Sequence, residues 1–239
     1  LEGRVVSRPE QPPLRRSACG DALAREAGER LRELARDDLP DERDLTALFD
    51  LVDRFHAAVF EASPALRVSC GRGCSNCCSQ MVFDVHAFEV ERIGRRLVEQ
   101  GRADAVRARL ERRREVYDRV RRDHPRRHDE DLDTWIERIA IEFWSEDEPC
   151  ALLDDDGSCS VHDVRPWSCR RSFAASDPEL CRGEHARDPR RRFFTLAPDK
   201  GFDPGLQDLD RFARYDVDTD QLDLALLRWL RANAATRPG

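Results

Sequence analysis

The stretch Cys70-Gly-Arg-Gly-Cys74-Ser-Asn-Cys77-Cys78 places four of the chain's nine cysteines within nine residues. A second block further along the chain holds four more: Cys150, Cys159, Cys169 and Cys181. Thiols at this density either oxidise to disulfides or bind metal. We therefore expect the two blocks to be halves of one metal-binding unit, brought together by helices.

A disulfide framework is the alternative to metal, and three features count against it. The chain has nine cysteines, an odd number, and Cys19 lies apart from both blocks. The chain of 239 residues is long enough to bury a core without covalent staples. No apolar run approaches the ~20 residues of a membrane helix, and no secretory apolar region is visible. We expect a cytoplasmic location without membrane contact, where thiols stay reduced and act as metal ligands.

The composition predicts a mainly α fold. Charged residues make up 37% of the chain, and apolar residues recur at helical spacing in several stretches, such as 45–60 and 135–144. We expect a flexible tail over residues 1–18 and a single helical domain over 19–239. Within it, a cysteine-rich loop and a small β-hairpin would form the metal site, at about residues 68–185.

Two charged or titratable features of the helices need an interpretation. The arginines between residues 106 and 123, Arg113 among them, alternate with acidic residues, which predicts a solvated, salt-bridged face. The net charge of −7 also disfavours a nucleic-acid partner. His56 lies on the apolar side of its expected helix, so we predict a hydrogen-bonded core histidine.

The second block contains a turn signal. Asp154-Asp-Asp-Gly157 separates two short apolar runs, and an Asp-Gly pair in this position is typical of a β-hairpin. A hairpin here would hold Cys150 and Cys159 near each other.

The spacing of the cysteines in the first block indicates which metal centre they could bind. Cys70-x₃-Cys74-x₂-Cys77 has the spacing by which radical-SAM enzymes hold three irons of a [4Fe–4S] cluster, although the alternating strand–helix pattern of those enzymes is missing. Cys74-x₂-Cys77 also fits one zinc knuckle, but the wider spacings of the second block do not form another. Because neighbouring residues rarely point at one metal, either Cys77 or Cys78 would serve a second iron, a second ion or no metal.

Both blocks together resemble a known family. Cys70-x₃-Cys74-x₂-Cys77-Cys78 and the later segment Cys159-Ser-Val-His162-Asp-Val-Arg165-Pro-Trp-Ser-Cys169-Arg170 are similar to the YkgJ-like cysteine-cluster family of zinc- or iron-chelating proteins. The resemblance spans roughly residues 68–185. Two positions depart from the family pattern: Ala151 stands where the family has proline, and His162 where it has tyrosine.

The resemblance implies a metal site, with eight candidate ligands and three neighbouring groups. The ligands are Cys70, Cys74, Cys77, Cys78, Cys150, Cys159, Cys169 and Cys181. His162, Arg165 and Arg170 are candidates for contact with the cofactor, His162 from outside the ligand set. The two arginines would bind an anion or stabilise thiolate charge; alternatively, they would pair with nearby acidic residues such as Asp154 and Asp163.

Two functions follow from these observations. The first is a metal-binding protein that holds an iron–sulfur cluster of the [4Fe–4S] type, or zinc, in a redox or structural role. The alternative is an iron-dependent enzyme that modifies a protein, peptide or small molecule at an open position on cluster or non-cluster iron. Some flagellin lysine methylases carry a similar cysteine cluster, which is the reason to consider a protein or peptide partner.

Overall fold

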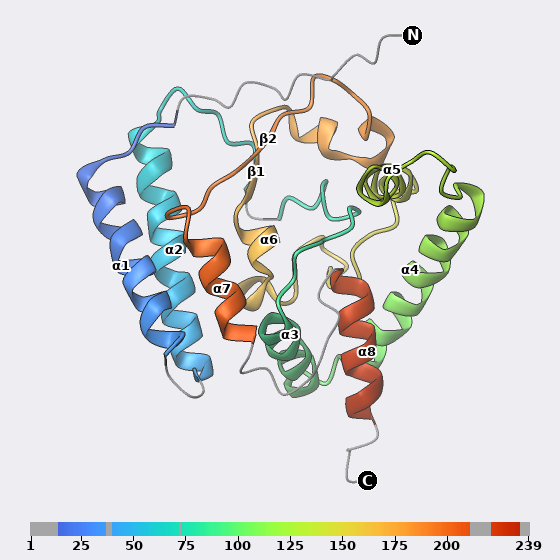
Figure 1. The fold of residues 1–239 in the computed structure, drawn as a ribbon, viewed down its shortest axis with the longest axis horizontal. Coiled ribbons are helices and arrows are strands. Elements are labelled where there is room, and N and C mark those ends of the chain that lie inside the picture. Colours follow the sequence, from blue (N-terminus) through green and yellow to red (C-terminus); the bar gives the residue numbers. More distant parts are fainter. Residues whose placement is uncertain (1–13, 37–39, 72, 211–220, 235–239) are drawn as a thin grey trace.

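The computed structural model describes residues 14–36, 40–71, 73–210 and 221–234, and within them the chain is mainly helical (Figure 1). This confirms the predicted fold class; residues 1–13 of the expected tail lie outside the described part. The described residues form eight α-helices: α1 (Ala18–Leu34), α2 (Glu42–Ala62), α3 (Ala87–Glu99), α4 (Ala103–Asp123), α5 (Leu132–Ser145), α6 (Trp167–Arg170), α7 (Phe202–Asp210) and α8 (Leu222–Ala234). None of these helices is long and apolar enough to cross a membrane.

Helices α1 and α2 lie side by side on one flank of the molecule (Figure 1). Asp41 caps α2 by accepting a 2.8 Å hydrogen bond from the amide of Asp44. Leu48, Val52 and Phe55 recur at helical spacing and are buried, since this face of α2 meets its neighbours. The apolar periodicity of the sequence thus accounts for this pair.

A second core forms where α3, α4 and α8 meet. Ile93 and Leu97 of α3 pack in one cluster with Leu110 of α4 and Leu226 of α8. At Gly94 a Cβ atom would lie 2.3 Å from the indole of Trp229, so only glycine permits this close approach of α3 and α8.

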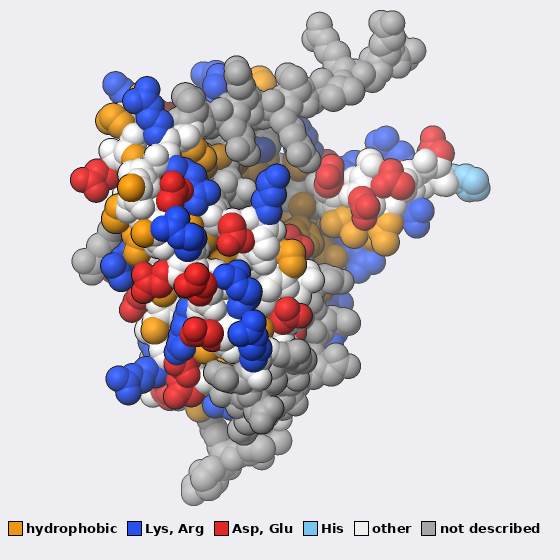
Figure 2. Space-filling view, turned by 60° about the vertical axis from the view of Figure 1, so that its left-hand side comes forward, with side chains coloured by type: hydrophobic (Ala, Val, Ile, Leu, Met, Phe, Trp, Pro, Cys, Tyr) orange, Lys and Arg blue, Asp and Glu red, His pale blue; other side chains and the backbone are white. Residues whose placement is uncertain are grey.

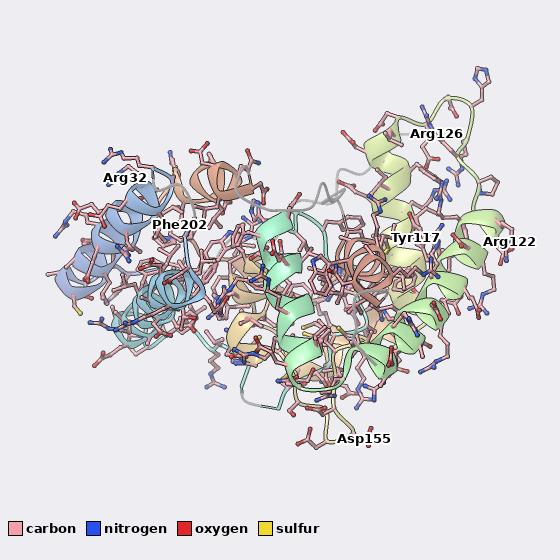
Figure 3. All side chains as sticks on the ribbon, turned by 90° about the horizontal axis from the view of Figure 1, so that it is seen from below. Arg32, Tyr117, Arg122, Arg126, Asp155 and Phe202 are labelled. Atoms are coloured by element: carbon pink, nitrogen blue, oxygen red, sulfur yellow. The ribbon has the colours of Figure 1, made fainter. Side chains whose placement is uncertain are left out.

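Helix α4 packs against α5 at the opposite flank, and Figure 3 shows Tyr117 of α4 on the side facing α5. Tyr117 meets Phe143 edge-on, with ring centroids 6.3 Å apart. The prediction of a fully solvated arginine face on α4 is wrong at Arg113, whose side chain is only 2% exposed. The spacing of Val106, Leu110 and Val120 puts Arg113 on the buried stripe of the helix.

Strand pairing is sparse, and most of it was not predicted. β1 (Ser172–Ala174) pairs antiparallel with β2 (Phe193–Thr195), with Phe173 opposite Phe194. The hairpin expected after Cys150 forms as a tight turn with one bridge, between Leu153 and Cys159. Asp155 projects from its outer tip, away from the helices (Figure 3). Three short 3₁₀ turns complete the unit: η1 (His162–Val164), η2 (Pro178–Cys181) and η3 (Gly183–His185).

Candidate metal centre

The two cysteine blocks meet through their main chains. The amide of Cys150 donates a 2.7 Å hydrogen bond to the carbonyl oxygen of Cys78. This contact places the end of the first block beside the start of the second, as the sequence predicted for halves of one unit.

The first block is a loop held to the β1–η2 region. The amide of Cys74 bonds to the carbonyl of Gly71 at 3.0 Å, and Gly73 in this turn has φ +82°, a conformation that favours glycine. The amide of Ala174 donates to Sγ of Cys70 at 3.2 Å. The side-chain amide of Asn76 donates to the carbonyl of Pro178 at 2.8 Å. These contacts attach the loop to the segment that ends at Cys181.

Cys181 is the last residue of η2 and is buried. Burial raises the pKa of its thiol to about 12, and the nearby Cys77, Cys70 and Cys74 add to the shift. Cys70 and Cys74 themselves are exposed. The first-block loop and Cys181 therefore form one neighbourhood with an open side.

The turn between Cys150 and Cys159 is closed by main-chain bonds. Asp154 donates to the carbonyl of Ser158 at 2.8 Å, and Ser160 donates to that of Leu152 at 2.9 Å. Gly157 takes φ +79° at the tip. Cys150 and Cys159 are partly buried and pack against the α3–α4–α8 core. Burial raises the pKa of both thiols, that of Cys150 to about 12.

Cys169 is carried by the short helix α6, which a buried carboxylate anchors. Oε1 of Glu89 accepts a 2.6 Å hydrogen bond from the amide of Trp167, and Oε2 accepts one of 3.1 Å from the amide of His86. One side chain thus caps both α6 and α3. Burial and the nearby Cys150, Cys77 and Cys159 raise the pKa of the Cys169 thiol. Solvent still reaches Cys169, so its thiol is surrounded by protein but accessible from one side.

The adjacent cysteines Cys77 and Cys78 have opposite shifts. The Cys78 thiol donates a hydrogen bond to Cys77, which lowers the pKa of Cys77 to about 7 despite its burial. The pKa of Cys78 is raised by that same bond, by burial and by the charges of Cys77, Cys150 and Cys169. Cys77 is therefore the thiol that ionises first, and Cys78 faces the second block.

All nine cysteines are free thiols in the structure. Within the described residues, no three His, Cys, Asp or Glu side chains are arranged to enclose a single metal ion. A tetrahedral zinc site needs four sulfurs at about 2.3 Å from one ion. The eight thiols share a neighbourhood without forming such a cage, so their side chains would have to turn inward to bind one ion.

The three predicted cofactor neighbours have different surroundings. Arg170 is buried, pairs with Asp53 of α2 and donates a 2.8 Å hydrogen bond to the carbonyl of Asp163. Its ionic partner is therefore Asp53 and not an aspartate of the turn at residues 154–157. Arg165 contacts His162 and lies 3.8 Å from Asp53. Among the described residues, its buried Nε has no hydrogen-bond partner, and its charge acts on Cys159 and Cys169. Burial and Arg165 lower the pKa of His162.

Three residues that support the centre were not picked out as site residues from the sequence. Glu89 anchors α6, and Arg113 reaches both blocks. Arg191 stacks on Trp144, with its guanidinium 4.1 Å from the ring centroid, and its charge partly offsets the rise in the pKa of Cys181. Nη2 of Arg113 donates to the carbonyl of Gln80 at 3.3 Å, and Nη1 donates to that of Glu148. Gln80 follows the first block and Glu148 precedes the second, so one guanidinium braces both.

Comparison with known proteins gives one match. The family model CxxCxxCC, described as "Putative zinc- or iron-chelating domain", matches residues 69–188, half of the chain. The matched range contains all eight clustered cysteines and excludes Cys19. No curated protein and no solved structure gives a significant match.

Proposed function

Because the chain belongs to the CxxCxxCC family of zinc- or iron-chelating domains, we propose that it is an iron–sulfur protein. In this proposal, thiolates from both cysteine blocks hold [4Fe–4S]-type iron–sulfur centres with a redox or structural role. The observation that carries it is the 2.7 Å hydrogen bond from Cys150 to Cys78, since it joins the two blocks.

The donor set fits a thiolate-ligated centre. All eight candidate ligands are cysteines, and nearby histidines have other partners: Nε2 of His56 bonds to the carbonyl of Leu196 at 3.0 Å, and Nδ1 of His86 lies 3.0 Å from Asp210. All-sulfur sites are typical of zinc or of iron–sulfur clusters. Arginines near the thiols, Arg165 and Arg191, would offset the negative charge of several thiolates.

One observation favours iron–sulfur over zinc. The Cys70-x₃-Cys74-x₂-Cys77 spacing is that of loops that hold three irons of a cluster. The chemistry that such a cluster supplies when bound is one-electron transfer.

Metal analysis of anaerobically purified protein tests the proposal. We expect iron and acid-labile sulfide in equal amounts, together with a broad visible absorption that bleaches on reduction with dithionite. Stoichiometric zinc in a colourless protein would refute the iron–sulfur assignment and leave a zinc-chelating domain. Protein free of both metals after anaerobic reconstitution would refute metal binding altogether.

The exposure of Cys70 and Cys74 supports a second candidate, an iron-dependent enzyme acting on a protein, peptide or small molecule. An iron held on this open side could keep one position for a substrate. Its test is the electron paramagnetic resonance signal of the reduced protein with and without added cyanide. A changed signal supports an open iron, whereas an unchanged signal means that every iron is fully ligated.

A further inference from the structure

We infer that the eight clustered cysteines form two separate four-thiolate metal sites. Site 1 consists of Cys70, Cys74, Cys77 and Cys181, and site 2 of Cys78, Cys150, Cys159 and Cys169. The inference rests on the proposed metal binding and assigns its ligands. Each site takes the same class of cofactor, an iron–sulfur cluster or a zinc ion, since four thiolates complete the ligand set of either.

Site 1 is defined by contacts between the first loop and the β1–η2 segment. Sγ of Cys70 accepts a hydrogen bond from the amide of Ala174 in β1, and the side chain of Asn76 donates one to the carbonyl of Pro178 at the start of η2. Both contacts lead to Cys181 and neither involves the Cys150–Cys159 turn.

Site 2 is defined by contacts among Cys78, the turn and α6. The main-chain bond from Cys150 to Cys78 and the bridge between Leu153 and Cys159 join three of its members. Cys169 enters from α6, which Glu89 fixes to α3.

The pair Cys77-Cys78 is the junction between the sites. Adjacent residues cannot both direct their side chains at one centre without strain, so an adjacent pair suits two centres better than one. Cys77 directly follows Asn76, whose side chain is bonded to Pro178 at the start of η2, and this contact assigns Cys77 to site 1. The 2.7 Å bond from Cys150 to Cys78 assigns Cys78 to site 2.

Paired substitutions test this division. Cys181→Ser removes a ligand of site 1 and Cys159→Ser one of site 2, while Cys19→Ser is the matched control because Cys19 is an exposed thiol outside both sites. The readouts are metal and sulfide per chain after anaerobic reconstitution, with far-ultraviolet circular dichroism to confirm folding. Wild type should hold about eight irons, or about two zinc ions, per chain.

The expected pattern is non-additive within a site and additive between sites. Each single variant should lose about half of the metal, and C70S/C181S should lose no more than C181S. C159S/C181S should lose nearly all of it, and C19S none. Loss of all metal in one single variant, or equal metal in C159S/C181S and C181S, would overturn the two-site division.

Native mass spectrometry of the wild type gives a second measurement that does not depend on folded variants. Two successive mass increments per chain support two sites, and a single increment overturns the division while leaving metal binding intact. A wild-type protein with no increment would instead refute the proposed function itself.

Discussion

Cys150 and Cys78 are joined by a main-chain hydrogen bond of 2.7 Å, although one belongs to the turn before α6 and the other to the loop before α3. A main-chain bond fixes the two backbones whatever the cysteine side chains bind. The centre therefore depends on the groups that hold these backbones in place, and most of those groups are buried charged side chains. This dependence can be measured as a change in the free energy of unfolding when such a group is replaced.

Arg113 is the first such group. Its Nε lies 2.9 Å from Asp223, and the two side chains are 2% and 9% exposed. Arg113→Leu removes the cation from this buried pair, so we expect the free energy of unfolding to fall by about 3–5 kcal/mol. Urea denaturation of metal-free protein, followed by circular dichroism, measures the loss.

The neighbouring Arg112 provides the matched control, since it lies one position along α4 and is exposed. Arg112→Leu should change the free energy of unfolding by no more than about 0.5 kcal/mol. The double variant R113L/D223L should recover part of the loss, because neither charge then stays buried alone. Equal effects of R112L and R113L would contradict the assigned role of Arg113.

Glu89 is the second group. Its two carboxylate oxygens accept the amide hydrogens of His86 and Trp167, at 3.1 and 2.6 Å. Glu89→Gln leaves one acceptor oxygen in place of two, so one buried amide loses its partner, and we expect a loss of about 1–3 kcal/mol in a urea titration. Glu99→Gln, an exposed substitution on the same helix, is the control and should be near neutral. A neutral E89Q would show that α6 is held by other contacts.

His56 gives a pH dependence. Burial lowers its pKa from 6.5 to about 4, and its Nε2 bonds to the carbonyl of Leu196. Between these two values the unfolded chain binds a proton that the folded chain does not, so stability falls as the pH drops from about 6.5 to about 4. The slope is at most about 1.4 kcal/mol per pH unit, and the total about 3 kcal/mol.

The check for His56 is the difference in unfolding free energy between wild type and His56→Gln, measured on metal-free protein from pH 7 to pH 4.5. This difference should shrink steadily toward low pH. His128→Gln, at an exposed histidine, is the matched control. A pH-independent difference for H56Q would mean that the pKa of His56 is the same in the folded and the unfolded chain.

Some of these structural features can be predicted from the sequence, and others cannot. The helices and the core position of His56 were predicted because local apolar spacing determines them. The alternation of charges along α4 predicts an exposed Arg113, but Arg113 lies three residues after Leu110 on the buried stripe of the helix. The β1–β2 pairing and the contact between Arg170 and Asp53 join distant segments, and no local pattern predicts such contacts.

For the metal centre, the sequence predicted the eight clustered cysteines as ligands but not their grouping. The spacing alone favours Cys70, Cys74 and Cys77 as one ligand set, but it does not predict whether Cys181 belongs to that set. That assignment depends on contacts such as the bond from Asn76 to Pro178, which form only in the folded chain. The ligand set itself stays a prediction until metal is measured.

Arg165 provides a prediction for the redox properties of the proposed cluster. Its guanidinium charge acts on Cys159 and Cys169, and no group in the described part of the chain bonds to its buried Nε. Removing a positive charge disfavours the reduced cluster, because that state is the more negative one. Arg165→Gln should therefore lower the reduction potential by tens of millivolts. For one electron, about 1.4 kcal/mol corresponds to roughly 60 mV. Spectroelectrochemical titration measures the shift, and Arg122→Gln, at an exposed arginine near the end of α4, should leave the potential unchanged. An unchanged potential in R165Q would place Arg165 outside the field of the cluster.

Gly157 connects the turn geometry to metal retention. It takes φ +79° at the tip of the Cys150–Cys159 turn, and an added Cβ would lie 3.3 Å from Oγ of Ser75 in the first block. Gly157→Ala should cost about 1–2 kcal/mol because the left-handed conformation is unfavourable for alanine. The strained turn should also release metal to a chelator several times faster than wild type. Gly71→Ala is the matched control, since no atom lies within 4 Å of its Cβ position and its φ is not positive. Equal release rates for the two variants would show that the turn does not hold the ligands of site 2 in place.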